Sequence, residues 1–183
     1  MKSRNYAGIS LLASLAACTS ATAENRSKKT VRRPPKSPNV IVILADDLGY
    51  GDLKCYGAKN VETPHVDKLA SEGIRFTNAH TVAATSTPSR YSLLTGEYAW
   101  RRPDTDIAAG DVKMIIRPEQ YTMADMFKSA GYATAAIGKW HLGLGDKTGG
   151  QDWNAPLPAA LGDLGFDYHY IMPLQPTVYL VYL

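Results

Sequence analysis

The chain has 183 residues, of which 45% are apolar and 20% are charged. This length corresponds to one domain, with or without a tail, and the composition is typical of a folded protein and excludes wholesale disorder. Two cysteines are too few for a scaffold held by disulfides. Residues 1–38 hold eight of the 20 Lys and Arg side chains and one of the 17 acidic ones, so the rest is mildly acidic. That charge argues against nucleic acid as a partner.

The N-terminus has the pattern of a signal peptide, which we assign to residues 1–23. Two basic residues precede an apolar run over residues 9–17, which is too short to span a bilayer. Small residues followed by Cys18 resemble a bacterial lipoprotein processing site, and a lipid-anchored chain would then begin at Cys18. The alternative is cleavage after residues 21–23 (ATA), which would release a soluble secreted protein. We therefore predict an exported protein, and we favour a periplasmic or outer-membrane lipoprotein over the soluble form.

Residues 24–38 form a basic, proline-rich segment that is almost free of apolar side chains. Such a segment cannot bury enough surface to offset its conformational entropy. We therefore predict a solvated linker between the signal peptide and the folded body.

The body, residues 39–183, alternates between strand and helix patterns. The apolar, β-branched run over residues 39–45 (NVIVILA) predicts a strand buried on both faces of a sheet. Thr63 as N-cap and Pro64 in the first turn predict a helix that ends at Gly73.

The same alternation continues along the chain. Residues 74–82 predict a second strand, and residues 88–95 predict a short helix that ends at Gly96. Thr122 begins another predicted helix, which ends at Gly131.

A third strand is predicted over residues 132–137. This order predicts an α/β fold with a mostly parallel sheet flanked by helices. In such sheets, ligands bind at the carboxyl ends of the strands. A polar set follows each predicted strand: Asp46 and Asp47, then Ser86 to Arg90, then Lys139 and His141.

Asp46 and Asp47 are adjacent carboxylates that follow an apolar strand pattern. Their charges repel unless something neutralises them, and a hard divalent cation with oxygen ligands would do so. The ordinary alternative is a solvated loop.

Ser86 lies at the start of a predicted helix, where backbone N–H groups and the helix dipole favour an anion. Arg90 lies one turn further and can return to the same place. Lys139 and His141 project to one side of an extended segment and could hold an anion and move a proton. The alternative for the helix start is a capping serine with an exposed arginine.

These segments together resemble the sulfatase family, in the alkaline-phosphatase-like superfamily. Residues 86–96 (STPSRYSLLTG) are similar to its nucleophile motif, with Ser in place of the commoner Cys. Residues 38–52 resemble its opening strand and metal loop, and residues 131–143 resemble its second signature. The resemblance covers roughly residues 38–173 and implies hydrolysis of a sulfate ester on a carbohydrate or an aryl alcohol.

The resemblance also implies that Ser86 is oxidised to formylglycine by a separate maturase that accepts Ser. Pro88, Ser89 and Arg90 belong to the motif that serves this maturation, and Thr87 would serve maturase recognition and helix entry. An aldehyde hydrate carries two hydroxyls, so one can attack sulfur and the other can expel sulfate and restore the aldehyde.

By the same resemblance, Asp46, Asp47 and the side chain at position 86 would ligate Ca²⁺. Arg90 and Lys139 would stabilise the transferring group, and His141 would be the base for sulfate expulsion.

Members of the sulfatase family are considerably longer than this chain, and their second half supplies further metal ligands and substrate contacts. We therefore interpret residues 39–183 as a partial catalytic domain, incomplete on its C-terminal side. We expect the chain alone to bind metal weakly and to turn over little sulfate ester. Two alternatives stay open: a phosphate or phosphonate ester hydrolase of the same superfamily, and a non-catalytic remnant or surface-binding protein.

Overall fold

A computed structural model describes residues 37–172 of the chain. The chain divides into two compact units, Met1–Ile43 and Leu44–Leu183, and the elements below all belong to the second. The predicted signal peptide, the lipidation site at Cys18 and nearly all of the predicted linker lie outside the described residues.

The second unit contains three α-helices, two strands and four short 3₁₀ helices within the described residues. The α-helices and strands are α1 (Pro64–Glu72), α2 (Ser86–Thr95), α3 (Met123–Ser129), β1 (Ala135–Lys139) and β2 (Tyr168–Met172). The 3₁₀ helices are η1 (Tyr50–Asp52), η2 (Lys54–Tyr56), η3 (Ala99–Arg101) and η4 (Leu161–Leu164).

All three predicted helices are present, because each has local start and stop signals. Pro64 occupies the first turn of α1, and Gly73 follows its last residue. At α3, the Thr122 hydroxyl accepts a hydrogen bond from the Asp125 N–H, and the Asp125 carboxylate accepts one from the Thr122 N–H at 2.9 Å. The helix α2 begins at Ser86, two residues before the predicted start.

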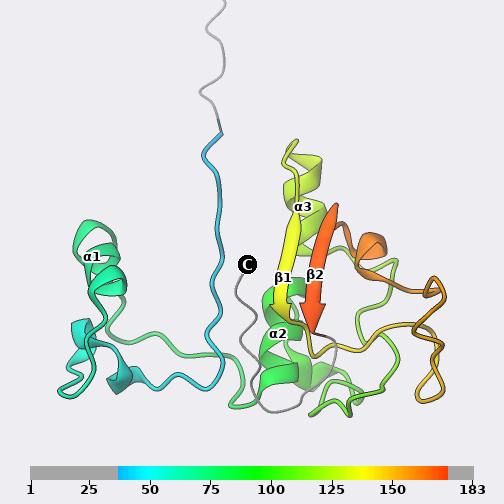
Figure 1. Ribbon diagram of the computed structural model, residues 1–183, viewed down its shortest axis with the longest axis horizontal. Helices are drawn as coiled ribbons and strands as arrows, with labels where there is room; N and C mark the ends of the chain where they lie inside the picture. The colour runs from blue at the N-terminus through cyan, green and yellow to red at the C-terminus, as the bar shows by residue number, and fades with distance from the viewer. Residues whose placement is uncertain (1–36, 173–183) are drawn as a thin grey trace, which may run out of the picture. The chain divides into compact units, whose positions relative to one another are not determined.

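β1 and β2 form a two-stranded parallel sheet, so the predicted fold class is confirmed (Figure 1). Ala135 pairs with Tyr168 at one end, and Lys139 pairs with Met172 at the other. A strand was predicted over residues 132–137. The observed strand β1 begins three residues later and ends two residues later. β2 was not predicted. Two parallel strands therefore bring Lys139 to the carboxyl end of this sheet.

The strands predicted over residues 39–45 and 74–82 are wrong, because neither segment forms a strand. Ile41 and Ile43 are each 83% exposed, and Ile74 is 84% exposed. A strand exists only when a neighbour completes its hydrogen-bond ladder. Among the described residues, β1 and β2 pair only with each other, so these apolar segments have no partner.

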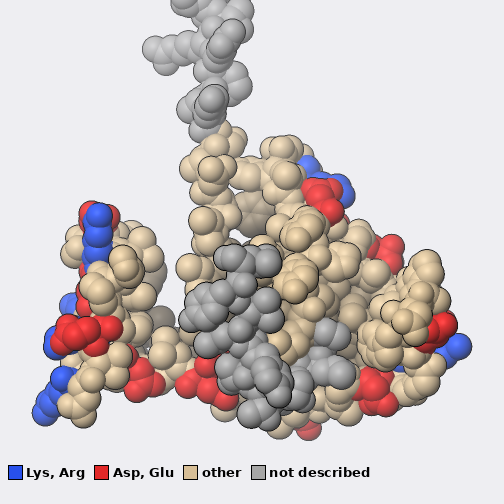
Figure 2. Space-filling model, in the orientation of Figure 1, with Lys and Arg blue, Asp and Glu red and all other residues tan. Residues whose placement is uncertain are grey.

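The surface of the described residues mixes both signs of charge. Lys54 pairs with Glu62 at 2.6 Å, and Lys68 pairs with Glu72 within α1. Basic and acidic side chains also lie next to one another over α1 in Figure 2. Within residues 37–172, no helix has the length and apolarity needed to cross a membrane.

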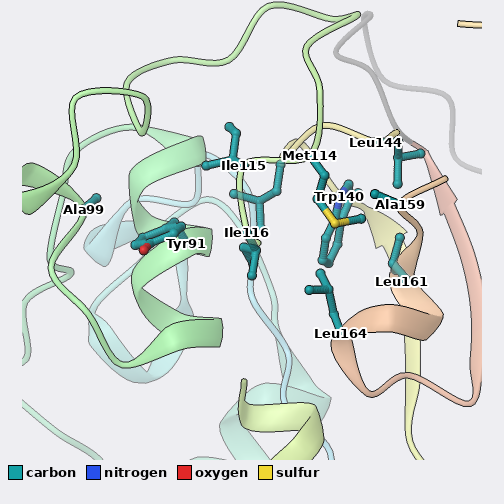
Figure 3. Close-up of a cluster of buried hydrophobic side chains, with 11 residues drawn as sticks. Tyr91, Ala99, Met114, Ile115, Ile116, Trp140, Leu144, Ala159, Leu161 and Leu164 are labelled. Atoms are coloured by element: carbon teal, nitrogen blue, oxygen red, sulfur yellow. The ribbon is translucent and has the colours of Figure 1, made fainter. Parts of the chain in front are cut away.

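The core lies between α2, the segment around residues 114–116, the end of β1 and η4. Tyr91 of α2, Ile116, Leu161 and Leu164 are at most 1% exposed, and they belong with Trp140 to one buried cluster (Figure 3). Because Trp140 directly follows β1, this core anchors both α2 and the segment that carries Lys139.

Candidate active site

The site is built on the first turn of α2. Ser86 is the first residue of the helix, and Arg90 lies one turn along the same face. The Arg90 Nε donates a hydrogen bond to the Ser86 Oγ at 2.8 Å. The helix therefore holds a hydroxyl and a guanidinium in a fixed relation.

Arg90 connects this helix to two other segments. Its Nη1 donates to the carbonyl oxygen of Lys139 at 2.6 Å, and its Nη2 lies 3.2 Å from the Asp46 Oδ1. The Arg90 side chain is only 12% exposed, whereas that of Asp46 is 38% exposed, so the Arg90–Asp46 contact stays open to water. A planar guanidinium has five donors in a rigid fork and can hold three separated acceptors in fixed positions, whereas the three donors of a lysine all lie on one nitrogen.

Asp46 lies between the two cations. Its Oδ2 is 2.5 Å from the Lys139 Nζ, and the Ser86 Oγ is 3.4 Å from its Oδ1. Burial by itself would raise the pKa of Asp46, but hydrogen bonds from Lys139 and Arg90 outweigh it and hold the pKa below its ordinary value. Asp46 is therefore a carboxylate at neutral pH.

His141 is buried beside this cluster, and its side chain is not hydrogen-bonded to Ser86. Its Nε2 lies 3.1 Å from the carbonyl oxygen of Ala108, and its Nδ1 has no partner among the described residues. Burial lowers the pKa of His141, and the charges of Lys139 and Arg90 lower it further. A neutral imidazole that donates to Ala108 from Nε2 keeps an acceptor lone pair on Nδ1.

Two predicted site residues have backbone conformations that L-residues rarely adopt. Asp47 has a φ of 56° and His141 a φ of 55°, and these are the non-glycine residues with positive φ in the described part of the chain. The left-handed region costs roughly 1–2 kcal/mol for a residue with a side chain. Such strain clusters at functional sites, where the surrounding fold imposes it.

A cavity of about 260 Å³ opens at this place. Asp46, Asp47, Ser86, Ser89 and Arg90 line it, so four of the predicted site residues and one residue of the maturation motif share one hollow. A hydrogen bond fixes the Ser89 side chain, because its hydroxyl donates to the carbonyl oxygen of Ala83 at 2.9 Å.

The predicted metal site is present only in part. Two carboxylates and a hydroxyl at one cavity fit a hard cation in kind, but Ca²⁺ takes six to eight oxygen ligands. Within residues 37–172, no group of three or more His, Cys, Asp or Glu side chains gathers closely enough to hold a metal ion. Both oxygens of Asp46 already receive hydrogen bonds from cations. Asp46, Asp47 and Ser86 could therefore offer oxygen donors to a cation, but the described residues do not complete a metal site.

Thr87 holds the site together in a way that the sequence analysis missed. The residue is fully buried; its hydroxyl donates to the carbonyl oxygen of His141 at 3.1 Å and accepts from the N–H of Ala108 at the same distance. Thr87 thus fixes the backbone of His141 and the segment that contacts its imidazole. A hydroxyl residue between Ser86 and Pro88 is a weak signal for this, because the partners lie far away in the chain.

Comparisons with known proteins show the family of the chain. The sulfatase family model matches residues 38–177. An N-acetylgalactosamine-6-O-sulfatase of Bacteroides thetaiotaomicron is 56% identical over 138 residues, which are 75% of this chain and 27% of that protein. The chain therefore spans about a quarter of the length of that relative.

Solved structures give the same result. One, from work on glycosaminoglycan metabolism by Bacteroides thetaiotaomicron, has a TM-score of 0.72 and 56% identity, and the match covers 75% of this chain and 28% of that one. A crystal structure of Ps i-CgsB with k-i-k-neocarrahexaose has a TM-score of 0.51 and 28% identity, covering 69% and 26%. Because the family model matches well over half of its residues, the chain belongs to the sulfatase family.

Proposed function

We propose that the protein hydrolyses a sulfate ester on a carbohydrate, with water as the second substrate and an alcohol, sulfate and a proton as the products. The observation that carries the proposal is the arrangement at α2. Arg90 donates a hydrogen bond to the Ser86 oxygen, Asp46 lies 3.4 Å from that oxygen in the same cavity, and Lys139 pairs with Asp46. One cation at the hydroxyl and a second one paired with the neighbouring carboxylate suit a substrate whose reacting group is an anion.

Each of these side chains has a task that follows from its contacts. Arg90 holds the oxygen at position 86 in place and presents positive charge to the sulfate. Lys139 adds a second positive charge next to Asp46, which lines the cavity. Asp46 lies between the two cations and keeps them from moving apart. His141, whose Nδ1 has no hydrogen-bond partner among residues 37–172, is the base that can accept a proton.

Two further groups belong to the proposal. A formylglycine made from Ser86 by a maturase that recognises Pro88, Ser89 and Arg90 would supply a nucleophile that can be regenerated. Asp46, Asp47 and the group at position 86 would contribute oxygen ligands to Ca²⁺, which supplies Lewis-acid polarisation of the sulfate when bound. We also propose that the protein is exported and anchored by lipid at Cys18.

The substrate class rests on the relatives. The similar protein from Bacteroides thetaiotaomicron is named for the 6-O-sulfate of N-acetylgalactosamine, and another similar structure holds a carrageenan oligosaccharide. We therefore propose a sulfated glycan as the substrate, with 6-sulfated N-acetylgalactosamine as the first candidate.

The test has two readouts. Mass spectrometry of the peptide that contains Ser86, from protein made in its host or together with a Ser-accepting maturase, should show the loss of two hydrogens. The same protein should release sulfate from N-acetylgalactosamine 6-sulfate slowly, because we expect little turnover from this chain alone, and Ser86→Ala should abolish both signals. Ser71→Ala, an exposed serine of α1, is the matched control and should leave both unchanged.

The outcomes separate the alternatives. Release of phosphate from a matched phosphate ester at a higher rate than sulfate would favour the phosphohydrolase of the same superfamily. An unmodified Ser86 with no hydrolysis of either ester would favour the non-catalytic remnant.

A further inference from the structure

The imidazole of His141 and the hydroxyl of Thr87 contact the same residue, Ala108. The Thr87 hydroxyl accepts a hydrogen bond from the Ala108 N–H, and the His141 Nε2 lies at hydrogen-bond distance from the Ala108 carbonyl oxygen, both at 3.1 Å. The same hydroxyl donates to the carbonyl oxygen of His141, also at 3.1 Å. The three residues therefore form a closed circuit of hydrogen bonds, which we call the Thr87 circuit.

The Thr87 circuit is buried and firmly anchored. Thr87 is fully buried, and His141 is only 2% exposed, so water does not compete for these hydrogen bonds. The residue before His141 is fixed as well, because the Trp140 N–H donates to the carbonyl oxygen of Met172 at 3.0 Å. The left-handed φ of 55° at His141 persists because such surrounding contacts impose it.

The Thr87 circuit also determines which nitrogen of His141 carries hydrogen. A carbonyl oxygen only accepts, so the hydrogen bond to Ala108 requires hydrogen on Nε2. Nδ1 is buried and has no partner among residues 37–172. Hydrogen on Nδ1 would leave a buried donor unpaired, which is rare and costly in proteins. The neutral ring with a lone pair on Nδ1 is therefore the form that fits these surroundings.

We propose that Thr87 is a positioning residue, which keeps hydrogen on the His141 Nε2 and so leaves Nδ1 as the nitrogen that can accept a proton. The use of Nδ1 as a base rests on the proposed function, whereas the tautomer does not. Without the Thr87 hydroxyl, the Ala108 N–H and the His141 carbonyl each lose a partner. The imidazole would then be free to leave the Ala108 carbonyl and to place hydrogen on either nitrogen.

Nuclear magnetic resonance tests this role without requiring turnover. In the ¹⁵N-labelled full chain at neutral pH, a ring nitrogen with hydrogen and one with a lone pair resonate far apart. We expect His141 to show hydrogen on Nε2 and a lone pair on Nδ1. His141→Gln would assign its signals among the four histidines of the chain. The other three, His65, His80 and His169, are exposed and serve as references for rings in contact with water.

Substitutions at position 87 separate positioning from packing. Thr87→Val keeps the shape and removes the hydroxyl, so both ring nitrogens of His141 should show averaged shifts. The Nε2 hydrogen should exchange with water about tenfold faster, the factor that corresponds to one hydrogen bond. Thr87→Ser keeps the hydroxyl and should retain the wild-type signals. Thr122→Val is the matched control, because Thr122 is 2% exposed and its hydroxyl donates to the Leu164 carbonyl at 2.8 Å.

The outcomes are distinct. Far-UV circular dichroism would verify that each variant is folded, and Thr87→Ala is a second hydroxyl-free variant should Thr87→Val not fold. Hydrogen on Nδ1 in the wild-type chain would overturn the proposal, as would unchanged His141 signals in a folded hydroxyl-free variant. An equal change in Thr122→Val, or loss of the wild-type signals in Thr87→Ser, would do the same. The expected tautomer without sulfate release would count against the proposed hydrolysis alone.

Discussion

At the residue scale, Arg90 is the side chain on which the candidate site depends most. It contacts Ser86, Asp46 and the Lys139 carbonyl from one planar group. In Arg90→Lys, at least one of these acceptors would lose its donor, because an ammonium cannot match the fork geometry. We expect a loss of about 2 kcal/mol in the free energy of unfolding, measured by urea denaturation.

The control for this substitution is Arg117→Lys. Arg117 pairs with Glu119 at 3.1 Å, and both side chains are more than half exposed. Exposed pairs contribute roughly 0–1 kcal/mol. Equal losses at positions 90 and 117 would show that the Arg90 contacts do not stabilise the fold.

Gly143 is the second residue whose identity the fold constrains. Its φ is +68°, and a Cβ added there would lie 2.0 Å from the Lys113 carbonyl oxygen. Gly143→Ala therefore combines a left-handed conformation with a backbone clash. We expect a loss of about 3 kcal/mol or more in the free energy of unfolding.

Gly150→Ala separates those two causes. Gly150 has a φ of +63°, but nothing lies within 4 Å of an added Cβ. The alanine there should cost about 1 kcal/mol, the value for a left-handed conformation alone. If both substitutions cost the same, close packing against Lys113 is not what Gly143 provides.

At the element scale, a carboxylate connects the start of β1 to the start of β2. Asp167 accepts hydrogen bonds from the N–H and the hydroxyl of Thr134 at 3.0 and 3.1 Å, and it lies 2.8 Å from the Lys128 Nζ. The hydrogen bond from Lys128, followed by those from Thr134, lowers the pKa of Asp167. The charged form is therefore favoured in the folded state.

The lowered pKa of Asp167 determines how the stability of the fold depends on pH. A lowered pKa in the folded state stabilises the protein above the ordinary aspartate pKa of about 3.9, and the contribution disappears as the pH falls through the lower folded value. Asp167→Asn should melt at a lower temperature than wild type at pH 7 and at nearly the same temperature at pH 2–3. A difference in melting temperature that does not change with pH would contradict this assignment.

The elements also show which local sequence patterns are enough to predict secondary structure. The helices α1 and α3 begin at Thr63-Pro64 and after Thr122 as predicted, because capping and first-turn signals act within one turn. The apolar run over residues 39–45 has a strong strand pattern and forms no strand. A helix satisfies its own hydrogen bonds, whereas a strand needs a neighbour that the pattern cannot name.

At the scale of the whole molecule, the described residues leave large apolar side chains exposed. Ile41 and Ile43 are each 83% exposed, and Ile137 of β1 is 74% exposed. Contiguous exposed apolar surface binds hydrophobic dyes and promotes association. The 183-residue chain should therefore bind anilinonaphthalene sulfonate in its folded state.

Substitution distinguishes exposed from packed side chains. The double variant Ile41→Ser, Ile43→Ser should bind less dye and keep the melting temperature of the wild-type chain, since these side chains bury little surface. A clear fall in melting temperature, measured by differential scanning fluorimetry without the dye, would show that they are packed.

The residues alone determined the family, the three helices and the set of side chains that meet at α2, because capping signals and motif spacing are properties of short segments. Asp46, Ser86, Arg90 and Lys139 were expected at one sheet edge, and hydrogen bonds now join them. Only the tertiary structure decided that β1 pairs with β2 and that Thr87 holds the backbone of His141. The strand pairing joins Ala135 and Tyr168, and the Thr87–His141 hydrogen bond joins residues 54 positions apart. Long-range packing energies, not local propensities, choose such partners.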